Sequence, residues 1–390
     1  MAEAYIVAAS RTAGGRKGGR LRDWHPADLA GALLNDLIDR TGIDPAAVED
    51  VVMGCVTQSG EQSTNIARNA VLASKLPESV PATSVDRQCG SSQQALQFAA
   101  QAIMSGTMDV VIAAGVESMT RVQMGQAVIL PAQAGLGVPK SPRMEDRYPN
   151  IQFSQFMGAE MVAKKYGLTK DQLDEYGYLS HQRAIAATQG GAFKNEILAL
   201  DGVDAEGGKV RHDSDEGIRF NADLQGMRGV KLLQEGGALT AATSSQICDG
   251  ASGVMVVSEQ ALKDYGLTPL ARIHHLSVIG HDPVIMLEAP IPATERALKR
   301  AGMSIDDIDL FEVNEAFASV PVAWLQKTGA DPERLNVNGG AIALGHPLGA
   351  SGTKLMTTLL NALQARGKRY GLQTMCEGGG LANVTIVERL

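Results

Sequence analysis

The pattern of apolar and polar residues along the chain predicts buried strands that alternate with helices. Residues 1–7 end in a short apolar stretch that predicts a first strand, and 109–115 are almost uninterrupted apolar residues, as in a strand buried on both faces. After residue 90, apolar residues recur at helical spacing, and the same spacing returns over 355–363, so both helices are expected to be buried. In the first helix these positions are Ala95, Phe98, Ala99, Ala102 and Ile103.

Two segments of the chain resemble one another. Residues 42–54 and 302–314 each contain a glycine, an acidic turn and then an apolar strand. The copies lie roughly 260 residues apart, far more than the period of a solenoid repeat. The pattern therefore predicts a duplicated α/β domain. Between 121 and 248, prolines, charged helices and polar loops replace the strand pattern, which indicates an insertion that carries ligand specificity.

Composition narrows the class of protein without naming an activity. The chain has 390 residues, of which 44% are hydrophobic and 20% charged, and it contains 43 glycines, which suits a soluble α/β protein of two or three domains. A net charge of −8 argues against nucleic acid as the main partner but permits an anionic ligand on a local basic patch. The sequence shows no membrane span and no signal peptide, and the basic stretch 11–20 follows the first strand, so a cytoplasmic protein is expected.

Four cysteines stand at positions 55, 89, 248 and 376. None belongs to a CxxC pair, which argues against a metal site or a disulfide framework and favours free thiols. Cys89 follows an extended segment, 80–85, and precedes a helix that opens at Gly90. The helix dipole and free N–H groups are expected there to lower the pKa of the thiol and favour the thiolate. A small buried core cysteine is the alternative, and for an isolated cysteine the commoner one.

Three further motifs could place reactive groups near such a thiol. His346 lies in a glycine-rich loop before a proline, which suits an imidazole that activates a thiol or donates to an oxyanion. Cys376 ends an apolar segment and precedes three glycines, whose N–H groups could form an oxyanion hole. Asn314 and Glu315 put two polar groups after a strand in an apolar setting. Taken singly, these motifs also fit a surface loop, a turn or a helix cap.

Together, the order and spacing of these motifs resemble the thiolase family over essentially the whole chain. The resemblance rests on DRQCGSS around Cys89, NEAF at 314–317, GHP at 345–347 and the glycines after Cys376. It implies an α/β fold of two similar βαβαβαββ halves in a five-layer αβαβα arrangement, with a loop domain inserted after the first half. The implied domains are an N-terminal half over 1–120 and 249–270, a loop domain over 121–248, and a C-terminal half over 271–390.

The resemblance also implies a role for each motif. Cys89 resembles the nucleophile that becomes acylated, and His346 resembles the imidazole that assists it and donates to the thioester oxygen of the acetyl-CoA enolate. Asn314 resembles the residue that holds a water in the same oxyanion hole, and the N–H groups of Cys89 and Gly378 resemble the second hole. Cys376 resembles the general acid/base, for which an ordinary thiol pKa of about 8.5 would suit both proton transfers.

The implied reaction is that of an acetyl-CoA C-acyltransferase: coenzyme A cleaves a 3-oxoacyl-CoA to acetyl-CoA and a shortened acyl-CoA, reversibly. Coenzyme A is a substrate here, and neither a further cofactor nor a metal is expected. The expected partners are acyl-CoA and coenzyme A, without nucleic acid or membrane, in a homodimer or homotetramer. Three alternatives stay open, namely an acetyl-CoA acetyltransferase that forms acetoacetyl-CoA, a 3-oxoacyl synthase, and a non-catalytic protein that binds CoA or lipid. The second thiol, Cys376, favours a thiolase over a synthase.

The insertion and its flanks are expected to bind the substrates. The candidates for contacts with the acyl group and coenzyme A are Phe156, Met157, Ser245, Phe317, Arg228 and Lys231. Phe156 stands where acetoacetyl-CoA thiolases carry histidine, which argues against strict acetoacetyl-CoA specificity. Glu377 replaces a usual apolar residue. The runs TSSQ at 243–246 and CEGGG at 376–380 resemble a bacterial subgroup that includes thiolases of steroid and other bulky acyl-CoA breakdown.

Overall fold

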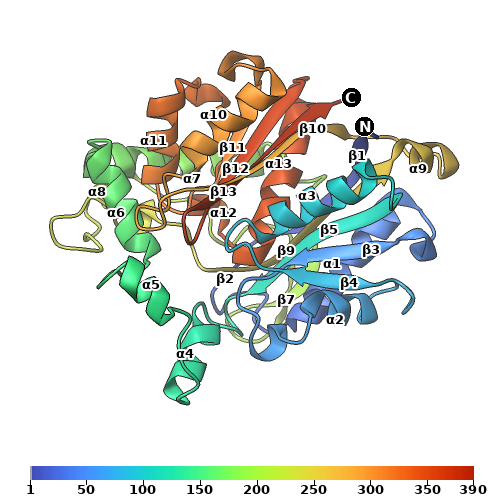
Figure 1. Ribbon diagram of the computed structural model, residues 1–390, viewed down its shortest axis with the longest axis horizontal. Coiled ribbons are helices and arrows are strands. Elements are labelled where there is room, and N and C mark those ends of the chain that lie inside the picture. Colours follow the sequence, from blue (N-terminus) through green and yellow to red (C-terminus); the bar gives the residue numbers. More distant parts are fainter. Residues whose placement is uncertain (1) are drawn as a thin grey trace.

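The computed structural model describes residues 2–390 and contains a large mixed sheet, in the order β11-β12-β13-β10-β1-β9-β5-β3-β4 (Figure 1). The strands on this path are β1 (Ala4–Thr12), β3 (Asp50–Gly54), β4 (Ala82–Val85), β5 (Val110–Ser118), β9 (Cys248–Ser258), β10 (Ala271–Gly280), β11 (Leu310–Val313), β12 (Tyr370–Glu377) and β13 (Leu381–Arg389). Strands β1 and β5 lie where the apolar runs predicted them, and both are buried along their whole length.

The predicted duplication is confirmed by the strand order. In the first half, β3 pairs in parallel with β4 and β5, and the sheet continues antiparallel through β9 to β1. In the second half, β11 pairs in parallel with β12, and the sheet continues antiparallel through β13 to β10. Leu335 forms a parallel bridge to Phe311 on the side of β11 where β4 would stand. A short antiparallel contact between β1 and β10, at Tyr5 and Ile6, joins the two halves.

Helices cover the two halves in the predicted five layers (Figure 1). Side chains of β3 alternate between two cores: Val51 and Met53 pack in an outer core, and Val52 packs in a central one. The central core also contains Leu96 and Met356, from the two helices that lie between the sheets. These two are α3 (Ser91–Met104) and α13 (Ser351–Ala365), and the outer layers are formed by α1 (Pro26–Thr41) and α2 (Ile66–Leu72) on one side and α10 (Pro290–Ala301) and α11 (Ser319–Thr328) on the other.

The buried face of α3 differs from the one that its apolar spacing predicts. Phe98 is 42% exposed, so its predicted burial is wrong. The helix instead buries Gln93 and Gln97, because their side-chain amides donate to backbone carbonyls of β10, β12 and β13. A buried amide that finds such acceptors loses little by leaving water. The prediction for α13 is confirmed, since its apolar residues between Leu355 and Leu363 are buried.

The stretch 121–248 is mainly helical and contains short strands. Its elements are α4 (Gln126–Gln133), α5 (Pro142–Arg147), α6 (Gln155–Lys165), α7 (Lys170–Gln189), β6 (Ile197–Leu198), β7 (Leu200–Val203), β8 (Lys209–His212) and α8 (Leu224–Arg228). Strand β9 then enters the first half between β1 and β5. The exact domain limits given above stay a prediction. The helices of residues 2–390 include none with the length and apolarity needed to cross a membrane.

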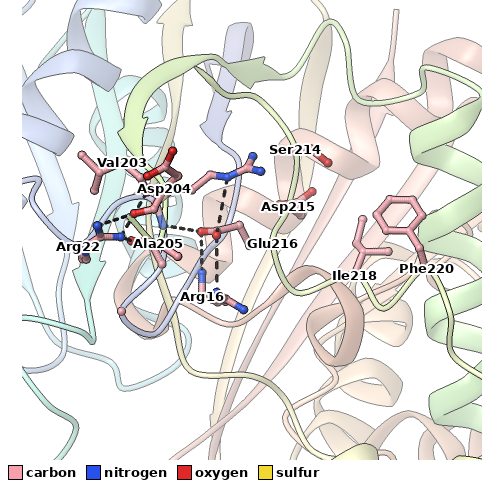
Figure 2. A pocket seen from close by; sticks show the side chains of 13 residues that line it. Arg16, Arg22, Val203, Asp204, Ala205, Ser214, Asp215, Glu216, Ile218 and Phe220 are labelled. Carbon is pink, nitrogen blue, oxygen red and sulfur yellow. Dashed lines mark hydrogen bonds and ion pairs between the residues drawn. The ribbon is translucent and has the colours of Figure 1, made fainter. Parts of the chain in front are cut away.

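The basic, glycine-rich stretch after β1 borders a cavity of about 660 Å³ (Figure 2). Glu216 of the insertion accepts hydrogen bonds from the backbone N–H groups of Arg16 (3.2 Å) and Arg20 (2.9 Å), and β2 (Gly15–Arg16) pairs with β9. These contacts fasten the stretch to the fold, as expected for a segment that follows a strand. The residues that line this cavity include none of those predicted to carry chemistry.

Candidate active site

Four of the residues singled out in the sequence line one cavity of about 230 Å³. They are Phe156, Ser245, Phe317 and His346. The Phe156 and Phe317 rings stand edge to face with their centroids 5.4 Å apart. The last residues of the insertion reach this cavity because the Ser245 N–H donates to Ala316 O (2.9 Å) and the His346 N–H donates to Gln246 O (3.0 Å). The cavity therefore lies where the insertion meets the second half.

Cys89 lies directly behind the wall of this cavity, in the turn between β4 and α3. Its side chain is buried in a cluster with Met119 and Leu348, which both line the cavity. The turn is sharp: Gln88 has a left-handed φ of 50°, and α3 begins at Ser91. The Ser91 hydroxyl donates to Gln88 O (2.6 Å), which holds the turn closed. The predicted position of Cys89 at the N-terminus of a helix is confirmed.

The predicted pKa values of the two thiols are wrong. Burial, together with the nearby Glu377, raises the pKa of Cys89 to about 12, so the helix N-terminus does not prevail. Burial also raises the pKa of Cys376 well above its ordinary value, and the neighbouring Cys89 contributes in the same direction. Both side chains are therefore protonated thiols at neutral pH. A base must remove a proton before either can act as a nucleophile or as a base.

His346 is held in one tautomer by the start of α13. Its Nδ1 lies 2.5 Å from Ser351 Oγ, and that hydroxyl donates its single proton to Pro347 O (2.8 Å). Ser351 must therefore accept from His346, which places the imidazole proton on Nδ1 and leaves Nε2 free to accept a proton. Burial lowers the pKa of His346 to about 3, so the ring is neutral. The Nδ2 atom of Asn314 lies 3.5 Å from that Nε2.

Asn314 and Glu315 follow β11, and the side-chain carbonyl of Asn314 and the carboxyl of Glu315 differ in their hydrogen bonding. Glu315 accepts hydrogen bonds from Tyr176 OH (3.0 Å), Ser180 Oγ (2.7 Å) and two further donors in 336–342, which ties β11 to α7 and to the loop that leads to His346. Asn314 Oδ1 is buried without a hydrogen-bond partner among residues 2–390. An unpaired buried acceptor beside an imidazole is a place where a water or a ligand group can bind.

Glu117, at the end of β5, is a buried carboxyl that the sequence motifs did not reveal. It accepts hydrogen bonds from the N–H groups of Val56 (2.9 Å), Thr57 (3.0 Å) and Gly349 (2.9 Å) and from the side chain of Gln62 (2.9 Å). It therefore holds the loop after β3 against the loop that carries His346. Its task resembles that of Glu315 in the second half. An isolated glutamate at a strand end gives no sequence signal for such a contact.

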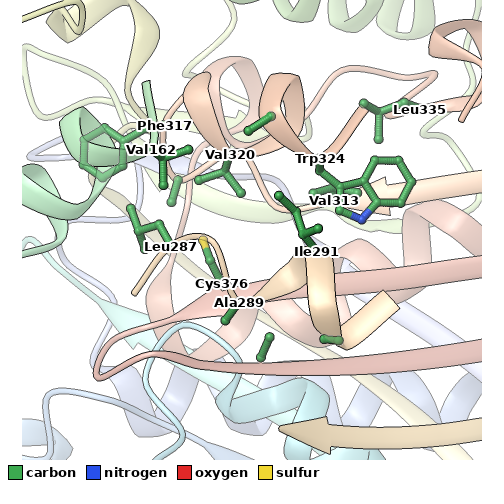
Figure 3. Close-up of a cluster of buried hydrophobic side chains, with 14 of the residues drawn as sticks. Val162, Leu287, Ala289, Ile291, Val313, Phe317, Val320, Trp324, Leu335 and Cys376 are labelled. Carbon is green, nitrogen blue, oxygen red and sulfur yellow. The ribbon is translucent and has the colours of Figure 1, made fainter. Parts of the chain in front are cut away.

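The second thiol stands at the end of β12. Figure 3 shows Cys376 beside Leu287 and Ala289, in the buried cluster that also contains Phe317 of the cavity wall. Gly378 begins the turn to β13, and the space where its Cβ would stand lies 3.1 Å from Gln88 Oε1, next to the Cys89 turn. The structure thus brings Cys89, Cys376 and Gly378 to one corner of the molecule.

Three residues predicted to bind substrate lie elsewhere. Met157 is 51% exposed on α6 and is absent from the cavity lining. Arg228 is engaged with two acids of α7, since its guanidinium lies 2.9 Å from Glu175 and 3.6 Å from Asp171. Lys231 is exposed beyond α8. The structure thus gives these three no contact with the cavity, and their roles stay predictions.

A second cavity, of about 200 Å³, adjoins the first and contains an arginine that the sequence motifs did not single out. Both cavities are lined by Ala241 and Gln246. The second is also lined by Arg219 and His181, and Arg219 is exposed to solvent. Together the cavities offer a path from the surface to the wall in front of Cys89. A long ligand with an anionic end could follow this path.

These groups have the chemistry that acyl transfer by covalent catalysis requires. A thiol can act as a nucleophile, a neutral imidazole with an unprotonated Nε2 can act as a base, and a second thiol can move a further proton. Residues 2–390 contain no cluster of three or more His, Cys, Asp or Glu side chains that could hold a metal ion.

Comparison with known proteins agrees with this arrangement over the whole chain. The thiolase N-terminal domain model matches residues 4–260, and the thiolase C-terminal domain model matches residues 267–389. The chain is 54% identical over 392 residues to the steroid 3-ketoacyl-CoA thiolase FadA6 of Mycobacterium tuberculosis, which covers 100% of this chain and 95% of that relative. It is also 44% identical over 397 residues to a 3-ketoacyl-CoA thiolase of Yersinia pestis, with 100% of both chains covered.

Proposed function

Because this chain belongs to the thiolase family and is an acetyl-CoA C-acyltransferase, we propose that Cys89 is its nucleophile and that His346, Asn314, Cys376 and Gly378 complete the catalytic site. The observation that supports this most is the fixed tautomer of His346. Ser351 holds the ring proton of His346 on Nδ1, so Nε2 carries no proton and is the basic atom of the ring. The thiol of Cys89 needs such a base, because its raised pKa keeps it protonated at neutral pH.

In the degradative direction the first step breaks a carbon–carbon bond. His346 Nε2 takes the thiol proton of Cys89, and the thiolate attacks the 3-oxo carbon of the substrate. The bond between C2 and C3 then breaks, which leaves an acyl-Cys89 and the enolate of acetyl-CoA. The new Nε2–H of His346 and a water held by Asn314 Oδ1 donate to the enolate oxygen. Because Ser351 holds Nδ1–H throughout, one ring nitrogen serves first as base and then as donor.

The second step returns the enzyme to its starting state. Cys376 gives its proton to the enolate carbon, which releases acetyl-CoA and leaves a Cys376 thiolate. That thiolate takes the proton of incoming coenzyme A, whose sulfur attacks the acyl-Cys89 carbonyl. The N–H groups of Cys89 and Gly378 are proposed to hold the oxyanion of this step. The shortened acyl-CoA leaves, and His346 returns the proton to Cys89.

We propose that the preferred substrates are 3-oxoacyl-CoA thioesters with bulky apolar acyl groups, including ring-bearing ones. The cavity wall supports this, because Met119, Met124, Leu233 and Phe156 give it an apolar surface. The printed name of the relative that is 54% identical, a steroid 3-ketoacyl-CoA thiolase, supports the same class. The edge-to-face contact of Phe156 with Phe317 places an aromatic ring where a histidine would favour a short, polar acyl group.

Thiolysis rates across a series from acetoacetyl-CoA to ring-bearing 3-oxoacyl-CoA test this preference. We expect kcat/KM for the bulky thioesters to exceed that for acetoacetyl-CoA by about tenfold or more, because apolar groups gain from burial in this cavity. Phe156→His is the matched variant, and it should shift the ratio toward acetoacetyl-CoA. If acetoacetyl-CoA were much the best substrate of the unaltered enzyme, the argument from Phe156 would be wrong.

We propose that Arg219, and not Arg228, binds a phosphate group of coenzyme A. Arg219 lines the cavity that adjoins the catalytic one, whereas Arg228 already pairs with two acids of α7. An arginine engaged with two acids has little charge left to offer to a phosphate. Ser245 lines the first cavity next to Gln246, which lines both, and this position supports a contact of that serine with coenzyme A.

Replacing each arginine with alanine separates these two candidates. Arg219→Ala is expected to raise the KM for coenzyme A in thiolysis by about tenfold, because a charge-assisted hydrogen bond to phosphate is lost. Arg228→Ala serves as the control and should leave this KM nearly unchanged. Steady-state kinetics with coenzyme A as the varied substrate measures both, and the reverse order of effects would reinstate Arg228.

We further propose a homodimer or homotetramer in the cytoplasm. Strand β4 ends the path of the large sheet and pairs with β3 on one side, which leaves its other edge open to a second copy. The mass of the protein in solution tests the assembly.

A further inference from the structure

Glu377 stands between the two proposed catalytic thiols. It follows Cys376 in β12, and its carboxyl packs so closely against Gly90, the residue after Cys89, that no Cβ would fit there. Opposite residues of paired strands share a face of the sheet, and successive residues alternate. Glu377 therefore points to the same side as Met375, which packs with Cys89, while Cys376 points to the other side. The side chain is 0% exposed.

The surroundings of Glu377 contain several acceptors and one nearby donor, the backbone N–H of Asn383, which opposes the rise in the pKa of Glu377 without forming a well-aligned hydrogen bond to either oxygen. Neither of its carboxyl oxygens has a hydrogen-bond partner among residues 2–390, and neither does the nearby Asn383 Oδ1. The amide of Asn383 donates instead to Gly90 O (3.2 Å). Glu117 and Glu315, in contrast, each accept four hydrogen bonds, whereas the buried Glu312 resembles Glu377 in having an unpaired carboxyl oxygen among residues 2–390. A proton on Glu377 removes the buried charge and supplies a donor to the unpaired acceptors around it.

The charge of Glu377 matters to the chemistry because of where the side chain lies. A carboxylate at this position raises the pKa of Cys89, and it acts on Cys376 in the same direction. The proposed reaction requires each of these thiols to become a thiolate in turn. A neutral carboxylic acid at position 377 permits this, whereas a carboxylate opposes it. Burial raises the pKa of Glu377 well above its ordinary value, and the positive charge of Arg87 acts against that shift.

We propose that Glu377 holds a proton in the active enzyme and is a positioning residue whose loss of that proton suppresses thiolate formation at Cys89. The inference rests on the proposed function through the role of Cys89 as nucleophile. With rising pH, Glu377 passes from neutral to charged, and the like charge then makes the Cys89 thiolate harder to form. Glu377 thereby sets an alkaline limit to the reactivity of the nucleophile.

Glu117 and Asp86 also raise the pKa of Cys89, but their contributions follow that of Glu377 and both carboxyls accept hydrogen bonds. Arg87, in the turn before Cys89, attracts a carboxylate and is not itself a switch at these pH values. Asp86 is exposed and accepts a hydrogen bond from the Gln88 N–H (2.7 Å), and Glu117 is fully hydrogen-bonded. The first turn of α3 presents uncharged serine and glutamine side chains, and β13 presents Asn383. Glu377 is the carboxyl in this set whose two oxygens both lack a well-formed hydrogen bond among residues 2–390.

The test follows Cys89 itself and needs no acyl-CoA. Alkylation of Cys89 by iodoacetamide, quantified by mass spectrometry of the Cys89 adduct, is measured against pH for the unaltered enzyme and for Glu377→Gln. The glutamine keeps the shape of a protonated glutamate and has no proton to lose. We expect the two profiles to diverge as pH rises, with the unaltered enzyme becoming slower than Glu377→Gln by about tenfold or more once a like charge appears.

Two results would overturn the proposal. Profiles that stay parallel at every pH would show that the charge of Glu377 does not reach Cys89, and a much faster Glu377→Gln already at neutral pH would show a carboxylate in the resting enzyme. Glu377→Met gives a second measurement should Glu377→Gln fail to fold, because methionine has a similar shape and no proton to lose, so its alkylation profile should diverge from that of the unaltered enzyme in the same way. Failure of the proposed thiolysis would leave the alkylation profiles unchanged, so the two failures are distinguishable.

Discussion

Replacing Cys89 with serine is expected to lower thiolysis of a 3-oxoacyl-CoA by about 10³-fold or more, since covalent catalysis loses its nucleophile and substrate binding and the oxyanion holes remain. A hydroxyl loses its proton far less readily than a thiol, and the base that acts on residue 89, His346, is the same in the variant. Initial rates of acetyl-CoA formation measure the loss. Mass spectrometry should show the acyl adduct on residue 89 of the unaltered enzyme and none on the variant.

Cys55→Ala is the matched control for this experiment. Cys55 is a second buried thiol of the N-terminal half whose pKa is also raised, but it packs in the outer core of that half. Its removal tests whether the loss of any buried thiol disturbs the fold enough to abolish activity. We expect Cys55→Ala to keep the adduct on Cys89 and most of the rate. Thiolysis by Cys89→Ser within a few fold of the unaltered enzyme would contradict the assignment of the nucleophile.

The parts of the fold that the sequence predicted correctly rest on local patterns. The duplicated halves show in two glycine–acid–strand segments, and α13 shows in leucine spacing, because periodic burial leaves a mark on each element separately. Helix α3 shows the limit of this reasoning. Its glutamines are buried because carbonyls of β10, β12 and β13 lie opposite them, and those carbonyls are about 180 to 290 residues away in the chain. The sequence around Phe98 does not indicate that these carbonyls lie opposite the helix.

The wrong pKa predictions for the site also arise because local sequence patterns do not show tertiary contacts. The predicted low pKa of Cys89 follows from its helix, a local feature, but the observed direction follows from burial and from Glu377, which arrive through packing. The role of Arg228 stays a prediction, and its pairing with Glu175 and Asp171 is likewise a tertiary contact that its own sequence neighbours do not show. The tautomer of His346 is fixed by Ser351, which is only five residues away in the sequence. It can be assigned only because the Ser351 hydroxyl donates its proton to Pro347 O and must therefore accept from the His346 ring. Motifs therefore predict which groups react, and tertiary contacts decide the ionisation of those groups.

The proposed acid/base role of Cys376 predicts a large loss of activity when this thiol is replaced. Cys376→Ser is expected to lower kcat for thiolysis by about 10²- to 10⁴-fold, the usual range for the loss of a general acid/base. The serine hydroxyl is a poorer acid toward the enolate, and its alkoxide is too costly to form when coenzyme A must lose its proton. Iodoacetamide should still alkylate Cys89 in this variant, which separates loss of proton transfer from loss of the nucleophile.

Ala382→Ser is the control for adding a hydroxyl to this apolar cluster. Ala382 stands opposite Cys376 in β13 and belongs to the same buried cluster, so the added hydroxyl enters a similar environment with the thiol intact. We expect it to retain activity within a few fold if it folds. A Cys376→Ser enzyme that matched it would contradict the acid/base role. The raised pKa favours that role in the second step, because a thiolate that forms with difficulty is a strong base toward the ordinary thiol of coenzyme A. It does not hinder the first step, since an enolate carbon is a stronger base than any thiolate and takes the proton even from a weakly acidic thiol.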